Sequence, residues 1–216
     1  MASIELSANE LSANAGADAA STHAPQSTGP DRLLREMPIG KIAIWWFLAS
    51  EIMIFGGLIA CYVLMRIAHG GWEAEAAHVK WQLGAINTLV LVTSSLTMIL
   101  AHYSVERDDR GAVSRYLGLT VILGLVFLGI KTFEYRADFA EGFTPLSGMF
   151  WSFYYMMTGL HAIHVTAGIV INAVLFAMAR RGTLWPRVQQ RVEFAGLYWH
   201  FVDVVWIFLF PLLYLS

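Results

Sequence analysis

The 216-residue sequence has few charged side chains and a single cysteine. Only 14% of its residues are Asp, Glu, Lys or Arg, whereas 57% are hydrophobic, a balance that no ordinary soluble domain of this size shows. Lys and Arg form no basic patch of the kind that indicates nucleic-acid binding. Cys61 has no intrachain partner, which excludes a disulfide framework, and its apolar surroundings predict a small buried side chain. The composition indicates a membrane protein.

The first 30 residues lack aromatic side chains and are rich in Ala, Ser, Asn and Thr. Such a segment buries too little apolar surface to offset the entropy of an ordered chain. It has acidic residues and no apolar core, so it does not match a secretory signal. We therefore expect a disordered tail over 1–30 and a folded domain over 31–216.

Long uncharged runs dominate the rest of the chain. About 20 apolar residues suffice for a helix to cross the hydrocarbon core of a bilayer. The sequence supplies five such runs, at about 41–66, 82–103, 114–136, 147–179 and 193–215. The connections between them are only about 10 to 16 residues long, too short for a separate extramembrane domain. The predicted fold is all-α, a polytopic membrane protein with a bundle of five transmembrane helices.

The distribution of Lys and Arg between alternate connections predicts the orientation of the bundle. Positively charged connections are retained in the cytoplasm. Ten fall on one side: Arg32, Arg35, Lys41, Arg107, Arg110, Arg115, Arg180, Arg181, Arg187 and Arg191. Three fall on the other side, Arg66, Lys80 and Arg136, and Lys131 lies inside the third run. We expect a cytoplasmic N-terminus and an outward C-terminus.

Ionisable side chains lie near the middle of three runs. Glu51 is in the first run, His161 and His164 are in the fourth, and His200 and Asp203 are in the fifth. A charged group at the bilayer centre costs about 2.5–3.5 kcal/mol on insertion scales, so each needs a partner or a task. The second run adds hydroxyl groups at about the same depth, on Thr93, Ser94, Ser95 and Thr97. These positions predict a buried polar core with hydrogen bonds between helices.

Three roles fit such a core. In the first, the groups satisfy one another and fix the helix register, with Glu51 and Asp203 neutral or paired. In the second, they handle protons for transport. In the third, His161, His164 or His200 binds a metal or haem, although the chain offers no convincing further ligand at similar spacing. No phosphate-binding loop, zinc-ligand spacing or serine hydrolase elbow is present.

Two further patterns concern packing. Lys131 and Glu134 lie one turn apart in the third run and are expected to pair or to snorkel. Glycines within the runs are expected to let helices approach closely. They are Gly56, Gly57, Gly118, Gly124, Gly129, Gly159 and Gly168.

Five segments in order resemble subunit III of heme-copper terminal oxidases, the cytochrome c oxidase polypeptide III family. They are FLASEIMIFGG (47–57), INTLVLVTSSLTMILAH (86–102), LGLVFLGIKTFEY (123–135), SGMFWSFYYMMTGLHAIHVTAG (147–168) and EFAGLYWHFVDVVWIFLF (193–210). The last is the most specific. Together they span nearly everything from about 40 to 216, and the chain is similar to the five-helix bacterial form of the family.

The resemblance implies an accessory subunit with no active site of its own, in a bacterial oxidase that reduces oxygen to water and translocates protons. Haem and copper are then expected in partner subunits, with no cofactor or metal in this chain, and with cytochrome c or quinol as electron donor. The expected partners are subunit I, subunit II and, where one is present, subunit IV, in the bacterial inner membrane. Structural phospholipids and support of proton uptake by the partner belong to the same expectation.

The resemblance also assigns the polar residues. Their expected role is an internal network rather than a catalytic site, formed by Glu51, His161, His164, Glu193, His200 and Asp203. On electrostatic grounds, lipid headgroups are expected near Arg180, Arg181, Arg187 and Arg191.

Two departures from the family pattern leave alternatives open. The chain begins at what would be the third helix of larger members, so their lipid-filled cleft must be walled by another subunit or be absent. Lys131 stands where oxidase members usually have glutamine. This lysine and the segments SFYYMMTG and FPLLYL make the chain resemble subunit III-like proteins associated with nitric oxide reductases. A stand-alone proton-coupled transporter is the third alternative; inverted repeats would favour it, and none is visible.

Overall fold

The computed structural model of the chain describes residues 39–181 and 185–215. These residues form the helices α3 (Ile39–Ala68), α4 (Glu73–Ala76), α5 (Trp81–Glu106), α6 (Arg110–Ala140), α7 (Met149–Arg181) and α8 (Trp185–Tyr214). No strand occurs among them, which confirms the all-α prediction. The predicted tail over 1–30 lies outside the described residues. All contacts discussed below lie within the unit Ala43–Ser216.

Within the described ranges, five helices are long and apolar enough to cross a membrane, as predicted. They are Gly40–Ala68, Trp81–Glu106, Arg110–Ala140, Met149–Arg181 and Arg191–Tyr214. The helix boundaries differ most at the start of α8, which begins at Trp185 rather than at about 193. α6 extends four residues beyond the predicted run at each end, over Arg110–Ala140 rather than about 114–136. Apolar runs mark only the part of a helix that faces hydrocarbon, and polar residues continue the helix beyond it. Asp109 caps α6, because its side chain accepts a hydrogen bond from the Ala112 N–H at 2.9 Å.

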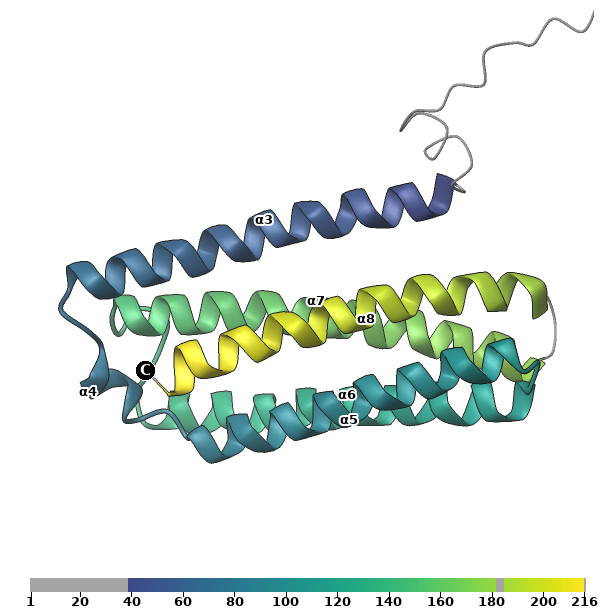
Figure 1. The fold of residues 1–216 in the computed structure, drawn as a ribbon. Helices are drawn as coiled ribbons and strands as arrows, with labels where there is room; N and C mark the ends of the chain where they lie inside the picture. Colours follow the sequence, from purple (N-terminus) through teal and green to yellow (C-terminus); the bar gives the residue numbers. More distant parts are fainter. Residues whose placement is uncertain (1–38, 182–184, 216) are drawn as a thin grey trace, which may run out of the picture. The chain divides into compact units, whose positions relative to one another are not determined.

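The helices α5, α6, α7 and α8 run alongside one another and form the packed core (Figure 1). α5 contacts α6 and α8, and α7 contacts the same two helices from the other side. Short connections make consecutive helices antiparallel neighbours. We call the end where α5 meets α6 and α7 meets α8 the arginine end, after Arg107, Arg110, Arg115, Arg180 and Arg181. The largest fully buried side chains are aromatic and include Trp199, Trp206, Tyr62, Tyr154 and Phe127.

α3 buries one narrow stripe of side chains. Leu48, Glu51, Phe55 and Tyr62 are its buried residues and recur at the three-, four- and seven-residue spacing of one helix face. The Phe55 ring lies 6.5 Å from that of Phe201 in α8, and the Tyr62 ring lies 5.7 Å from that of Phe153 in α7. The rest of α3 is largely exposed, as expected for a surface that meets lipid or another chain. Cys61 is exposed, so the prediction that it is buried was wrong: it lies beside this stripe rather than in it.

Trp199 occupies space that two glycines leave open. A Cβ atom at Gly168 of α7 would lie 2.6 Å from the Trp199 ring, and one at Gly124 of α6 would lie 3.0 Å from it. Both distances are too short for packed carbon atoms. The packing prediction is thus confirmed for these two glycines and for Gly118, whose Cβ would lie 3.0 Å from Phe176. It is wrong within this chain for Gly56, Gly57 and Gly129, which have open space beside them.

Replacement of Gly168 by alanine is expected to lower the free energy of unfolding by about 1–3 kcal/mol, because the added methyl group overpacks the core against Trp199. Gly129→Ala is the matched control. It adds the same methyl group within α6, where no atom lies within 4 Å. It is expected to be neutral or to stabilise the protein by up to about 1 kcal/mol through helix propensity. Denaturant unfolding in mixed micelles measures both, and equal midpoints would contradict the packing explanation.

Candidate functional site: polar contacts between helices

Hydroxyl groups of α5 join it to the neighbouring helices. Of the four hydroxyls predicted to form interhelical bonds, three cross to another helix: Ser94 to Trp199 at 3.0 Å, Ser95 to His200 at 2.7 Å and Thr97 to Thr120 at 2.7 Å. Thr88, which was not among the four, also accepts a hydrogen bond from the Trp206 indole N–H of α8 at 3.0 Å. The indole N–H of Trp199 donates to the Ser94 Oγ. Thr93 is exposed and donates to the Leu89 carbonyl of its own helix at 2.8 Å. The predicted interhelical bonds are confirmed for three of the four hydroxyls, each worth about 0.6 kcal/mol in a membrane bundle.

Glu51 and His164 connect α3 to α7. The Glu51 Oε2 and His164 Nε2 atoms lie 3.0 Å apart, and both side chains are nearly buried. His164 Nδ1 lies 2.8 Å from the Leu160 carbonyl, which can only accept, so Nδ1 carries a proton. The Phe55 ring packs edge-on against the imidazole, with 5.2 Å between the ring centroids. Together these contacts fix the orientation of His164.

This geometry requires one proton between Glu51 and His164. With Nδ1 protonated, the hydrogen bond at Nε2 forms in two ways: a neutral carboxylic acid donates to Nε2, or an imidazolium donates to a carboxylate. The pair has no net charge in either form. This neutrality lowers the cost of placing both groups at membrane depth.

Glu51→Gln is expected to leave the free energy of unfolding nearly unchanged, because the amide N–H₂ can donate to His164 Nε2. Glu51→Ala leaves that nitrogen without its partner and is expected to cost about 1–3 kcal/mol. Thermal unfolding of the purified protein, read from the loss of its monodisperse peak, separates the two variants. Equal loss of stability in the Gln and Ala variants would contradict this explanation.

Among the described residues, no hydrogen bond joins His161 or Asp203 to the Glu51–His164 pair. His161 is buried, and neither ring nitrogen has a hydrogen-bond partner in the described ranges. The rings of Phe127 and Trp206 flank it at 5.6 and 5.1 Å. Asp203 lies near Ser95, but that hydroxyl binds His200, and neither Asp203 oxygen has a partner in the described chain. Glu193 is half-buried, towards the arginine end of α8.

A second polar cluster lies nearer the opposite end of the bundle. Lys131 Nζ donates to Glu134 Oε2 at 3.1 Å, to the Tyr154 hydroxyl at 3.2 Å and to the Tyr214 hydroxyl at 2.6 Å. Both tyrosines in turn donate to Glu134 Oε1 at 2.8 Å. The side chains of Lys131 and Glu134 are only 3% and 0% exposed. Of the two expectations for this pair, pairing is confirmed and snorkelling is wrong.

Aromatic rings complete the surroundings of Lys131. Its Nζ lies 4.9 to 5.6 Å from the ring centroids of Tyr135, Tyr154, Trp206 and Tyr214, within reach of cation–π attraction. Side chains from three helices thus surround one buried cation. The tyrosine partners were not predicted, because Tyr214 is 83 residues from Lys131 along the chain. The available signal was general: a lysine within a spanning helix requires polar partners.

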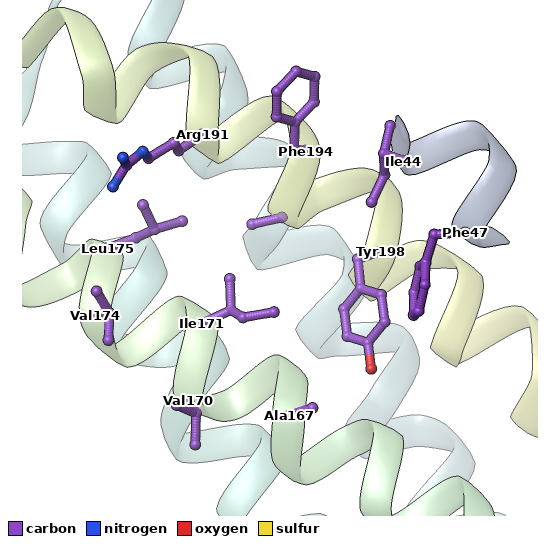
Figure 2. Close-up of a pocket in the computed structure, with 11 residues that line it drawn as sticks. Ile44, Phe47, Ala167, Val170, Ile171, Val174, Leu175, Arg191, Phe194 and Tyr198 are labelled. Atoms are coloured by element: carbon purple, nitrogen blue, oxygen red, sulfur yellow. The ribbon is translucent and has the colours of Figure 1, made fainter. Parts of the chain in front are cut away.

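The arginines assigned to lipid headgroups lie at the arginine end. Arg180 and Arg181 occupy the last turn of α7 and are exposed. Arg191 lines an apolar groove of about 480 Å³ between α3, α7 and α8. Figure 2 shows Arg191 near one end of this groove, with Phe47 and Tyr198 side by side near the other. The side chain of Arg187 is outside the described part of the structure.

Metal ligation finds little support in the described side chains. No group of three His, Cys, Asp or Glu residues within the described ranges is arranged to hold a metal ion. The imidazole of His161 faces aromatic rings rather than a second ligand. The absence of a cofactor from this chain stays a prediction. What the geometry provides is contact between helices.

Comparison with known proteins places the chain in one family. The family model described as cytochrome c oxidase subunit III matches residues 37–216. "Cytochrome c oxidase subunit 3" of Thermostichus vulcanus is 38% identical over 170 residues, which cover 78% of this chain and 83% of the relative. The protein of the same name from Bacillus subtilis (strain 168) is 34% identical over 188 residues, 86% of this chain and 90% of the relative.

"Probable quinol oxidase subunit 3" of Staphylococcus haemolyticus is also similar, with 35% identity over 189 residues, 86% of this chain and 92% of the relative. Five helices able to span a membrane, together with bacterial relatives of this kind, make the chain a multi-pass protein of the bacterial inner membrane. The family match covers every polar contact described above. The chain therefore belongs to the cytochrome c oxidase subunit III family of heme-copper terminal oxidases.

Proposed function

We propose that this chain is the accessory subunit III of a bacterial respiratory oxidase that reduces oxygen to water and translocates protons. It carries no haem or copper itself, because these are held by the partner subunits. The partners are subunit I, subunit II and, where present, subunit IV. The electron donor is cytochrome c or quinol, since relatives named for both oxidases are similar to this chain over most of its length. The observation that carries the proposal is the family match over residues 37–216.

The polar contacts support a scaffold role. Glu51 pairs with His164 across α3 and α7, and Lys131 binds groups on α6, α7 and α8. Each contact ties helices together at membrane depth, where an unpaired charge would be costly. A rigid bundle of this kind stabilises the subunit against which it packs. In this proposal, proton uptake takes place in that partner, and the proton shared by Glu51 and His164 stays in place.

Binding of structural phospholipids is part of the same proposal. The groove in Figure 2 is almost entirely apolar, with Ile171 and Val174 among the residues that line it. Arg191 is the one charged residue among the described residues that line it, and it is a suitable contact for a phosphate group, while the walls suit an acyl chain. Headgroups are further proposed at Arg180, Arg181 and Arg187, which belong to the same positively charged end of the chain.

Purification from native membranes tests the accessory role. A tag on this chain should bring down a haem- and copper-containing subunit in a fixed ratio, and the complex should consume oxygen with reduced cytochrome c or quinol. The isolated chain should show no Soret band and no stoichiometric copper. Either signal in the isolated chain would contradict the proposal.

A nitric oxide reductase accessory protein is the second candidate. The observation that favours it is Lys131, the position at which the sequence departs from the usual oxidase pattern. Recovery of a nitric oxide reductase in the same purification would select this candidate. A stand-alone proton-coupled transporter ranks third; proton-driven uptake by liposomes that contain only this chain would support it.

A further inference from the structure

A second groove lies between α6 and α7 at the arginine end. It has a volume of about 420 Å³ and is separate from the groove in Figure 2, with which it shares no residue. α6 contributes Ser114, Arg115, Gly118, Leu119 and Ile122, and α7 contributes Phe176 and Arg180. Two arginines from different helices therefore line one surface groove whose other walls are mostly apolar.

The positive charges of this groove are not neutralised by the described part of the chain. Arg115 and Arg180 are both exposed, and neither forms an ion pair with a carboxylate of the described residues. Arg115 Nε makes one long hydrogen bond, 3.4 Å, to the Gly111 carbonyl. The Arg180 guanidinium lies over the Phe176 ring at 5.7 Å, a contact that leaves its N–H groups available to donate. The pair is suited to an anion.

The apolar part of the groove lies deeper in the bundle. Leu119 and Ile122 are one and two turns from Arg115 along α6, so Ile122 is about 10 Å nearer the bilayer centre. Their side chains are 43% and 57% exposed. Gly118 lines the groove beside them without a side chain, and Phe176 closes the α7 side, 3.0 Å from where a Cβ of Gly118 would lie. Charge at the rim and exposed hydrocarbon below match the order of groups in a phospholipid.

We propose that this groove is a binding site for an anionic phospholipid. Its phosphate lies between Arg115 and Arg180, and an acyl chain lies along Leu119 and Ile122. Two guanidinium groups provide charge-assisted, bidentate hydrogen bonds to phosphate oxygens. Free inorganic phosphate would use the arginines but gain nothing from the apolar walls. The proposal rests on the lipid-binding part of the proposed function and does not depend on which enzyme is the partner.

The arginines are tested in the intact complex, by native mass spectrometry with phosphatidylglycerol as the titrated lipid. The double variant Arg115→Gln/Arg180→Gln should bind it about tenfold more weakly or worse, because two charge-assisted contacts are lost. Arg136→Gln is the matched control, since it removes an exposed arginine from the opposite end of α6. An unchanged affinity in the double variant, or an equal loss in the control, would overturn the proposal.

A second variant separates a phospholipid from free phosphate. Ile122→Trp fills the apolar part of the groove and leaves both arginines in place. This variant should bind phosphatidylglycerol more weakly, while its affinity for inorganic phosphate should stay unchanged. If its affinity for phosphatidylglycerol is also unchanged, the assignment of the acyl chain to this groove is overturned. Arg191→Gln reports on the other groove. If the unaltered complex retains no phospholipid, the lipid binding in the proposed function is contradicted as a whole. If Arg191→Gln reduces lipid binding and the Arg115 and Arg180 variants do not, only the site between α6 and α7 is contradicted.

Discussion

Glu134→Ala is expected to be among the most destabilising single substitutions in this protein, costing about 3–5 kcal/mol of unfolding free energy. The alanine leaves the Lys131 ammonium buried without its carboxylate, with only the hydroxyls of Tyr154 and Tyr214 as hydrogen-bond partners. The two tyrosines also lose their common acceptor, Glu134 Oε1. We expect little of this variant in the membrane, and a lower unfolding midpoint for the fraction that assembles. Thermal unfolding of the purified complex and quantitative immunodetection in membranes measure the two effects.

The protein contains a matched control for this variant. Lys80 and Glu141 form an ion pair of almost the same length, 3.0 Å, but their side chains are 38% and 47% exposed. Glu141→Ala should therefore cost only about 0–1 kcal/mol. The double variant Lys131→Met/Glu134→Leu removes both buried charges and should recover much of the loss caused by Glu134→Ala. Similar midpoints for Glu134→Ala and Glu141→Ala would mean that burial of the pair has no energetic consequence.

Trp199→Ala is expected to have a comparable effect, about 3–5 kcal/mol, because it opens a cavity where α5, α6, α7 and α8 meet. The Trp199 side chain is fully buried and fits against Gly124 and Gly168. These glycines lack the atoms that would fill the space left by the ring. The variant also leaves the Ser94 hydroxyl without the indole donor. The unfolding midpoint of the complex is the measurement.

Trp46→Ala is the control for Trp199→Ala, since Trp46 is 75% exposed on α3. It should shift the midpoint little in detergent. Trp199→Phe separates the effect of side-chain volume from that of the hydrogen bond, because it keeps an aromatic ring and removes the donor to Ser94. Its unfolding midpoint should lie between those of the unaltered protein and the alanine variant. A Trp199→Ala midpoint equal to that of Trp46→Ala would refute the packing of the glycines around this ring.

Much of the fold followed from local properties of the sequence. A helix needs about 20 apolar residues to cross a bilayer, and this requirement can be counted along the chain without knowing any contact. The five spanning helices were found in this way. The short α4 and the first turns of α6 and α8 were missed, because polar residues outside the hydrocarbon leave no apolar run to count. The interhelical hydrogen bonds of the Ser94, Ser95 and Thr97 hydroxyls were also predictable, since a polar group at membrane depth requires a partner.

By itself, the sequence determined the number of spanning helices, the depth of each ionisable residue and the family. Only the tertiary structure decided which groups on different helices meet: Glu51 with His164, Ser95 with His200, and Lys131 with Tyr154 and Tyr214. Depth depends on position along one helix, whereas partnership depends on how each helix is rotated about its axis against its neighbours. That rotation is set by the packing of large rings such as Trp199 against glycines on other helices, which no single segment of the sequence encodes.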